Sequence, residues 1–200
     1  MNTKADREEQ LVLELLDVVG RKSDVSQRHL ASHMGVALGL ANSYLKRCIR
    51  KGYIKITQVP ANRYLYYLTP KGMTEKGRLT VKYLRSSLEF YRRAGDSCVR
   101  VFDQCEARSF NRVLLGGCSD LAEIASVRAQ EHRVQIVGVY DPRAIQQRLV
   151  GKPVWRAARD CAPFDICVLT DLDSPTATYK HLREVVGRER VLVPDILSVE

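Results

Sequence analysis

Five residues between positions 42 and 50 carry side chains that recognise base edges and phosphates of a nucleic acid: Asn42, Ser43, Lys46, Arg47 and Arg50. An asparagine amide pairs with the edge of adenine, and cationic side chains pair with guanine or with phosphate. All five lie in a predicted helix over residues 38–51, whose apolar residues recur at helical spacing. A helix that is apolar on one side and cationic on the other is typical of recognition in the major groove of DNA.

The segments around this helix predict a small domain of three helices and a hairpin. Apolar spacing predicts a first helix over residues 8–19, and Ser26 is suited to cap a second one. The third helix is expected to bury Ala41, Tyr44 or Leu45, Cys48 and Ile49. Two β-type runs, residues 53–57 and 63–68, then flank a short loop. This order of elements predicts a winged helix-turn-helix domain.

Three more polar residues lie where such a domain meets the sugar-phosphate backbone. Arg28 is on the second helix, and Asn62 and Arg63 are at the hairpin tip, where a wing contacts the backbone or the minor groove. Any one of these cations alone is equally well explained as a solvated surface group. The prediction of DNA binding therefore rests on the combination of helices, hairpin and charge.

Charge is divided unevenly along the chain. Residues 1–95 contain 18 Lys and Arg against 8 Asp and Glu, whereas residues 96–200 contain 14 against 15. A basic first half beside a nearly neutral second half predicts that only the first half meets a polyanion. A basic surface that serves solubility alone is the alternative.

A second group of residues has the chemistry of a phosphate and ribose site. Strand-like and helix-like segments alternate from residue 112 to residue 193, which predicts a parallel α/β sheet. Ligands of such sheets bind beyond the carboxyl ends of the strands. The residues expected there are Gly116, Gly117, Ser119, Asp141 and Thr170. Backbone N–H groups of the glycine loop would hold a phosphate, and Asp141 would accept a hydrogen bond from a ribose hydroxyl.

The glycine pattern of this second group is incomplete. Gly117-x-Ser119-x-x-Ala122 keeps one glycine of the three in a G-x-G-x-x-G motif, and Asp120 adds a negative charge beside any phosphate. The alternative is a Rossmann-like domain that binds no nucleotide and serves dimerisation or protein contact. Asp141-Pro142 would then be a plain turn.

Helices are predicted to join the two domains. Thr69 suits the cap and Pro70 the first residue of a long helix that ends near residue 93 and carries an apolar stripe of Leu84, Leu88 and Tyr91. The predicted fold class is α/β with two domains. A winged helix-turn-helix domain (α+β) spans residues 1–95, a helical connector spans residues 96–111, and a small Rossmann-like parallel α/β domain spans residues 112–200.

The first half resembles MarR-like winged-helix regulators, in particular the group associated with exopolysaccharide clusters. The resemblance is carried by VSQRHLASHMGVALGLANSYLKRCIRKGYIKI and by RYLYYLTPKGMTEKGRLTVKYL. The resemblance implies a homodimeric repressor that binds double-stranded DNA, with polysaccharide genes as candidate targets. Ala37 stands where such a recognition helix has a Ser or Thr cap, which weakens the helix by roughly 1 kcal/mol.

The second half is similar to the NAD(H)-binding domain of the redox-sensing repressor Rex and to the first domain of sugar-linked oxidoreductases. The stretches concerned are VLLGGCSDLAEIA, IVGVYDP and VGKPVW. The resemblance implies a repressor that responds to a nucleotide-type effector, with NAD(H) and a nucleotide-sugar as the candidates.

The sequence has no recognisable catalytic or metal-binding motif. His29 and His33 are four residues apart without the carboxylate of a metalloprotease helix, and no G-x-S-x-G is present. Cys98 and Cys105 would share a helical face, so a redox pair is one reading and two small buried hydrophobes the other. With no apolar stretch long enough for a membrane span and no signal peptide, the protein is expected to be cytoplasmic.

Two functions follow from these observations. The first is a DNA-binding regulator with a metabolite sensor. The second is a non-catalytic adaptor that binds a nucleotide or a partner and whose winged helix contacts protein or RNA.

Overall fold

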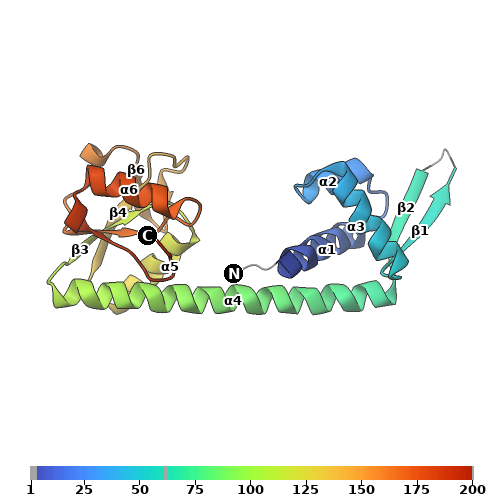
Figure 1. Cartoon of the computed structure of the whole chain (residues 1–200), viewed down its shortest axis with the longest axis horizontal. Helices are drawn as coiled ribbons and strands as arrows, with labels where there is room; N and C mark the ends of the chain where they lie inside the picture. The colour runs from blue at the N-terminus through green and yellow to red at the C-terminus, as the bar shows by residue number, and fades with distance from the viewer. Residues whose placement is uncertain (1–3, 61–62, 200) are drawn as a thin grey trace. The chain divides into compact units, whose positions relative to one another are not determined.

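The computed structural model of the chain describes residues 4–60 and 63–199. Backbone contacts divide the chain into two units, Met1–Ser87 and Leu88–Glu200, and the division falls within helix α4 (Pro70–Ala107; Figure 1). The division comes somewhat earlier than the boundary expected after residue 95. Each unit is described separately below.

Unit 1 has the predicted order of three helices and a hairpin. Helices α1 (Lys4–Arg21), α2 (Gln27–His33) and α3 (Leu38–Arg50) precede the antiparallel strands β1 (Ile54–Val59) and β2 (Arg63–Leu68). Ser26 caps α2 as expected, because its side chain accepts a hydrogen bond from the N–H of His29 at 3.1 Å. The helices enclose an apolar core with members from every element, including the fully buried Leu15, Leu16, Leu30, Cys48 and Ile54.

The turn from the hairpin into α4 explains the sequence Thr69-Pro70-Lys71-Gly72. The Thr69 hydroxyl donates to the Gly52 carbonyl at 2.6 Å and accepts from the Gly72 N–H at 3.0 Å, so it caps α4 and ties it to the start of the wing. A Cβ atom on Gly72 would lie 2.0 Å from the carbonyl oxygen of Tyr53. Glycine is therefore required there by close backbone packing.

Helix α4 corrects one prediction. The sequence suggested a helix ending near residue 93 and a separate connector over residues 96–111, but one helix of 38 residues runs from Pro70 to Ala107. Gly95 does not end it, because the helix goes on to bury an apolar side of Cys98, Val101, Phe102 and Cys105 in the core of unit 2. That burial outweighs the weak helix propensity of one glycine.

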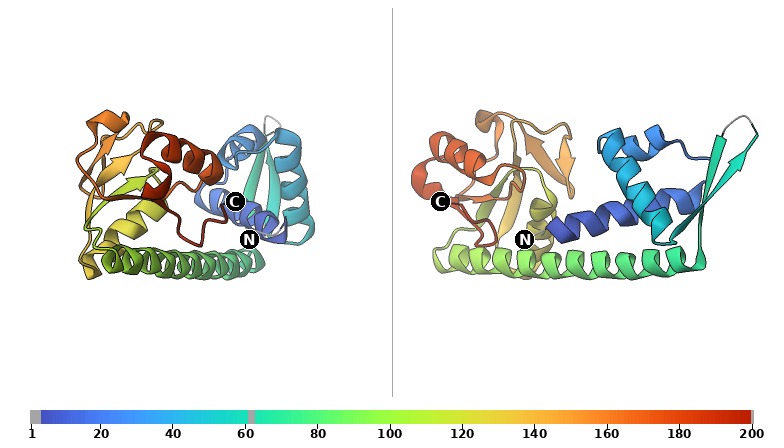
Figure 2. Two further views of the ribbon diagram at one scale, coloured as in Figure 1. Left: turned by 60° about the vertical axis from the view of Figure 1, so that its left-hand side comes forward. Right: turned by 45° about the vertical axis from the view of Figure 1, so that its right-hand side comes forward.

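Unit 2 is a mixed, mostly parallel six-stranded sheet in the order β5-β6-β4-β3-β7-β8. Figure 2 shows the ribbon of this unit from two further sides. The parallel strands are β3 (Arg112–Gly116), β4 (Gln135–Tyr140), β6 (Lys152–Trp155), β7 (Ile166–Leu169) and β8 (Val191–Leu192). Numbered along the chain, they have the spatial order 3-2-1-4-5, which reverses beside β3 as in doubly wound sheets. The predicted parallel α/β sheet is confirmed, and the antiparallel edge strand β5 (Arg148–Leu149) is an addition to it.

Two helices connect neighbouring parallel strands of unit 2. Helix α5 (Asp120–Arg128) leads from β3 to β4, and α6 (Pro175–Val185) leads from β7 to β8. Because these connections run in opposite directions from the middle of the sheet, right-handed crossovers place the two helices on opposite faces. The core holds Cys98 and Cys105 fully buried, and burial raises the pKa of Cys98 to about 12 and that of Cys105 to about 11. Both thiols are therefore poor redox nucleophiles in this state.

Among the described residues, no helix is both long enough and apolar enough to cross a membrane.

Candidate DNA-binding face and the loops of the parallel sheet

The loops at the carboxyl ends of β3, β4 and β7 bring together all five residues predicted to bind a nucleotide. The Thr170 hydroxyl donates to the Gly117 carbonyl at 2.7 Å, and the Ser119 hydroxyl donates to the Thr170 carbonyl. Ser119 also caps α5 by accepting from the Leu121 N–H at 3.1 Å. The predicted residues therefore meet, but they bond to one another.

Asp141 has a partner inside the chain where a ribose hydroxyl was expected. Its carboxylate, 7% exposed, accepts from the Cys118 N–H at 2.9 Å and from the Arg143 N–H at 2.8 Å. The Cys118 N–H belongs to the loop that was expected to hold a phosphate. The Asp141 carboxylate thus already accepts the hydrogen bond from a backbone N–H group that the phosphate of a nucleotide would need.

The two glycines of this loop are accounted for by packing within unit 2. Gly117 has a φ of +114°, and a Cβ there would lie 2.8 Å from the backbone of Asp171. A Cβ on Gly116 would lie 2.5 Å from a methyl group of Leu182 on α6. With Asp120, Asp141 and Asp171 around the loop, the arrangement is also unfavourable for a phosphate anion. As they stand, these residues do not fit a dinucleotide.

Replacing Gly117 with alanine is expected to destabilise unit 2 by at least about 2 kcal/mol, because the residue is both left-handed and in contact with backbone. Chemical denaturation monitored by circular dichroism measures the change. Gly77→Ala is the matched control: it lies in α4 with no atom within 4 Å of its Cβ position. That substitution should leave stability equal or up to about 1 kcal/mol higher. Equal unfolding midpoints for the two variants would contradict this account of Gly117.

Asp171 lies at the centre of a buried polar cluster after β7. It is 4% exposed and accepts from the Arg143 guanidinium, from the Thr178 hydroxyl, and from the Asp173 N–H at 2.9 Å. Burial acts to raise the pKa of Asp171, but the hydrogen bonds from Thr178, from the Asp173 and Ser174 N–H groups and from Arg143 together hold the pKa below its usual value.

The lowered pKa of Asp171 predicts a pH-dependent loss of stability on Asp171→Asn. Because the folded-state pKa lies below the unfolded value, the carboxylate stabilises the fold above about pH 4 and loses that effect as the pH falls through the folded pKa. The substitution should therefore cost about 2–3 kcal/mol at pH 7 and progressively less below pH 4. Urea unfolding at several pH values tests this, with the exposed neighbour Asp173→Asn as control. A cost independent of pH would refute it.

Helix α3 presents one apolar and one polar side, as predicted. Ala41, Tyr44, Leu45 and Cys48 are buried against the rest of unit 1. Ser43, Lys46 and Arg50 are exposed and, at intervals of three and four residues, lie in one stripe on the opposite side. These three predicted DNA contacts are thus available to a groove at the same time.

Two other predicted contacts on α3 are placed differently. The Arg47 guanidinium pairs with Glu8 of α1 at 3.2 Å, which directs it toward α1. Asn42 is half-buried, and its side-chain oxygen is buried without a hydrogen-bond partner in the described part of the chain. A contact between either side chain and DNA would require it to move first.

The remaining predicted contacts lie outside α3. Arg28 is exposed on α2, where it borders a shallow hollow of about 450 Å³ together with Leu38 and Tyr64. Arg63 begins β2 and its backbone pairs with Val59 of β1. Asn62, at the hairpin tip, is outside the described residues.

Comparison with known families identifies this part of the chain. Residues 9–55 match a family model described as winged helix-turn-helix DNA-binding. Unit 1 has the fold of a winged helix-turn-helix domain. The assignment rests on the matched residues, on the element order of unit 1, and on the polar stripe of α3.

Several solved structures are similar to this chain at low TM-scores. FabT of Streptococcus pneumoniae in complex with DNA is 28% identical over 39% of this chain and 55% of its own, with a TM-score of 0.32. A multiple antibiotic-resistance repressor (MarR) of Listeria monocytogenes is 15% identical over 52% of this chain and 81% of its own, with a TM-score of 0.32. Human N-acetylserotonin methyltransferase in complex with SAM is 13% identical over 92% of this chain and 75% of its own, with a TM-score of 0.37. The chain spans just over half the length of FabT. No curated protein sequence matches the chain.

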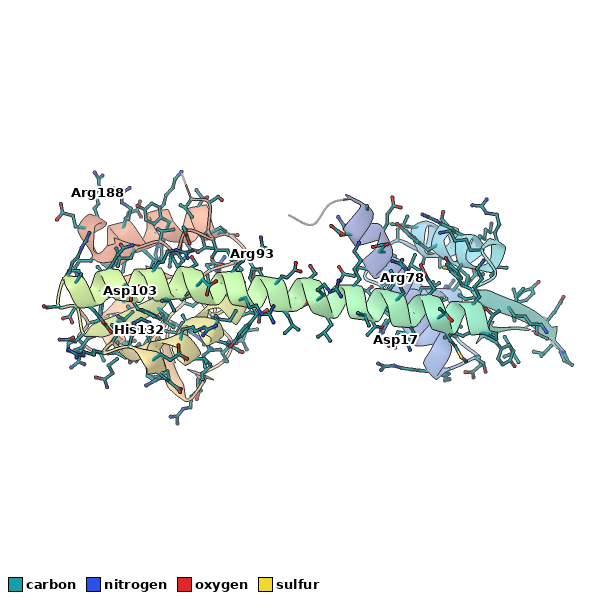
Figure 3. The ribbon with its side chains drawn as sticks, turned by 90° about the horizontal axis from the view of Figure 1, so that it is seen from below. Asp17, Arg78, Arg93, Asp103, His132 and Arg188 are labelled. Carbon is teal, nitrogen blue, oxygen red and sulfur yellow. The ribbon has the colours of Figure 1, made fainter. Side chains whose placement is uncertain are left out.

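A set of ion pairs in the winged-helix domain was not anticipated from the sequence. Lys76 of α4 pairs with Asp17 of α1 at 2.7 Å, and Arg78 of α4 pairs with Glu9 of α1 at 3.1 Å. Asp17 and Arg78 are labelled in Figure 3. Hydrogen bonds from Lys82 and Arg78 hold the pKa of Glu9 below its usual value. Together with the Arg47–Glu8 pair, these contacts fix α1 against α3 and the first turns of α4. The partners are tens of residues apart in the sequence, so no local pattern pointed to these ion pairs.

Proposed function

We propose that the protein is a transcriptional regulator that binds double-stranded DNA as a homodimer through its winged-helix domain. The observation that carries the proposal is the exposed stripe of Ser43, Lys46 and Arg50 on a helix whose other side is buried. A hydroxyl, an ammonium and a guanidinium in one line suit phosphates and base edges along a major groove. Binding, rather than catalysis, is the proposed activity.

The homodimer is supported by an apolar stripe on α4. Val81, Leu84, Leu88 and Tyr91 follow one another at intervals of three and four residues, and each is 40–58% exposed. This is the spacing of a two-helix seam, in which the same stripe on a second copy is the natural partner. A dimer of this kind would present two winged helices to the two halves of a palindromic site.

A nucleotide-type effector remains a hypothesis from resemblance. Binding of NAD(H) or a nucleotide-sugar at the sheet loops would require Asp141 to release the Cys118 N–H. The proposed regulator does not depend on such a ligand, and control of polysaccharide genes likewise rests on resemblance alone.

Selection of binding sites from random DNA by the purified full-length protein tests the proposal. At about 150 mM salt, where non-specific phosphate binding is weakened, we expect a palindromic motif. Repeating the selection with NAD, NADH and nucleotide-sugars tests the effector hypothesis separately. A folded dimer that enriches no motif would contradict the regulator and favour the adaptor that contacts protein or RNA.

A further inference from the structure

The first turn of the recognition helix carries two exposed leucines. Leu38 is 43% exposed and Leu40 is 45% exposed, and neither is one of the buried residues of the apolar core of the winged-helix domain. Every other large apolar residue of α3, namely Tyr44, Leu45, Cys48 and Ile49, is buried or packs on that core. Neither leucine is needed to fill the buried core, and Leu38 borders the open hollow beside Val25 and Tyr66.

The two leucines lie on either side of the polar stripe. Gly39 stands between them and is in register with Ser43, Lys46 and Arg50 at intervals of four, three and four residues. At 100° per residue, Leu38 and Leu40 project to opposite flanks of that line. Apart from the adjacent residues of α3 itself, no atom in the described part of the chain lies within 4 Å of a Cβ position on Gly39, so no other element covers the helix surface between the leucines.

The chemistry of the major groove supplies one apolar partner for such side chains. Among the base edges exposed there, only thymine carries a methyl group, on C5, and apolar side chains recognise it by contact. The N-terminal residues of a recognition helix are also the ones that reach base edges most directly.

From this arrangement we infer that Leu38 and Leu40 are specificity-determining residues that read thymine methyl groups in the DNA site. The inference rests on the proposed function, because it assumes that α3 enters a major groove. Ser43, Lys46 and Arg50 then supply polar and phosphate contacts. The leucines on the first turn select thymine at base pairs that flank those contacted by the polar stripe.

Deoxyuridine substitution in the selected DNA site tests this inference. Deoxyuridine pairs with adenine as thymidine does and lacks only the C5 methyl group, so each substitution removes one apolar contact and no hydrogen bond. With the full-length protein, we expect one or two thymidines in each half-site to show about three- to fivefold weaker binding on replacement, and the other thymidines no change.

The variants Leu40→Ala and Leu38→Ala show which leucine contacts which thymine methyl group. Each should bind the thymidine site about three- to fivefold more weakly and lose its sensitivity to deoxyuridine at one position while keeping it at the other. The slope of affinity against salt should be unchanged, because no phosphate contact is lost. Lys46→Ala is the contrasting variant, since it should lower the salt slope and keep the sensitivity to deoxyuridine.

The outcomes separate this inference from the proposed function. A protein that selects a DNA site and binds fully deoxyuridine-substituted sites as tightly as thymidine sites overturns the inference alone. Sensitivity that persists unchanged in both leucine variants also overturns it. A protein that selects no site at all contradicts the proposed function and the inference with it.

Discussion

Replacing Lys46 and Arg50 together with alanine will lower affinity for the selected DNA site by about 100-fold at about 150 mM salt. Both side chains are exposed on the outer stripe of α3, so their removal takes away contacts with DNA and leaves the core of the winged-helix domain intact. The slope of log affinity against log salt should fall by about two if both contact phosphate. Fluorescence anisotropy titrations over a range of salt concentrations measure both quantities.

Two comparison variants sharpen this result. Arg159→Ala removes an exposed cation from unit 2, with the Arg159 side chain 89% exposed, and should leave affinity and slope unchanged. Arg47→Ala breaks the pair with Glu8, so its effect on DNA binding would report whether Arg47 leaves Glu8 to reach DNA. If the Lys46 and Arg50 double variant bound as tightly as the unaltered protein, α3 would not be the DNA-reading helix.

Replacing Leu84 and Leu88 together with glutamate is expected to convert the proposed dimer to monomers at about 10 µM protein, because four carboxylates would have to be buried in the seam. The affinity for a palindromic site should fall at least about tenfold, because each monomer would bind one half-site without the gain from a second, linked domain on the other half-site. Sedimentation equilibrium or light scattering gives the mass, and the anisotropy titration gives the affinity.

Ile145→Glu is the control for the double glutamate variant. Ile145 is 88% exposed in unit 2 and is not part of the stripe on α4, so the same chemical change there should leave a dimer. Far-ultraviolet circular dichroism should show unchanged helix content in all three proteins, because the altered residues are exposed. An unchanged dimer mass for the Leu84 and Leu88 variant would show that α4 is not the seam.

The winged-helix domain could be predicted from the sequence because its signals are local. The cap at Ser26, the apolar spacing of α3 and the turn at Thr69-Pro70 each act within a few residues, and the structure confirms them. The same holds for the strands of unit 2, whose buried runs are short and separated by turns. Helix α4 was divided wrongly because its predicted apolar stripe ends at Tyr91, whereas burial of a further apolar side in the core of unit 2 continues the helix to Ala107.

The parts of the candidate sites that were missed depend on contacts between distant residues. Nothing local to Arg47 shows that Glu8, 39 residues away, lies within 3.2 Å of it. The spacing of Gly117 and Asp141 is the same whether the carboxylate binds a ribose or the Cys118 N–H. Only the three-dimensional arrangement shows that the loops are closed by their own hydrogen bonds.

The uninterrupted backbone hydrogen bonding of α4 has a consequence for proteases. These enzymes cleave segments that adopt an extended conformation in the active site, and in most two-domain proteins the linker supplies such a segment. Here the division between the units falls inside a helix of 38 residues, so cleavage between them requires several turns to unwind locally. The rate of cutting there therefore reports how often α4 opens.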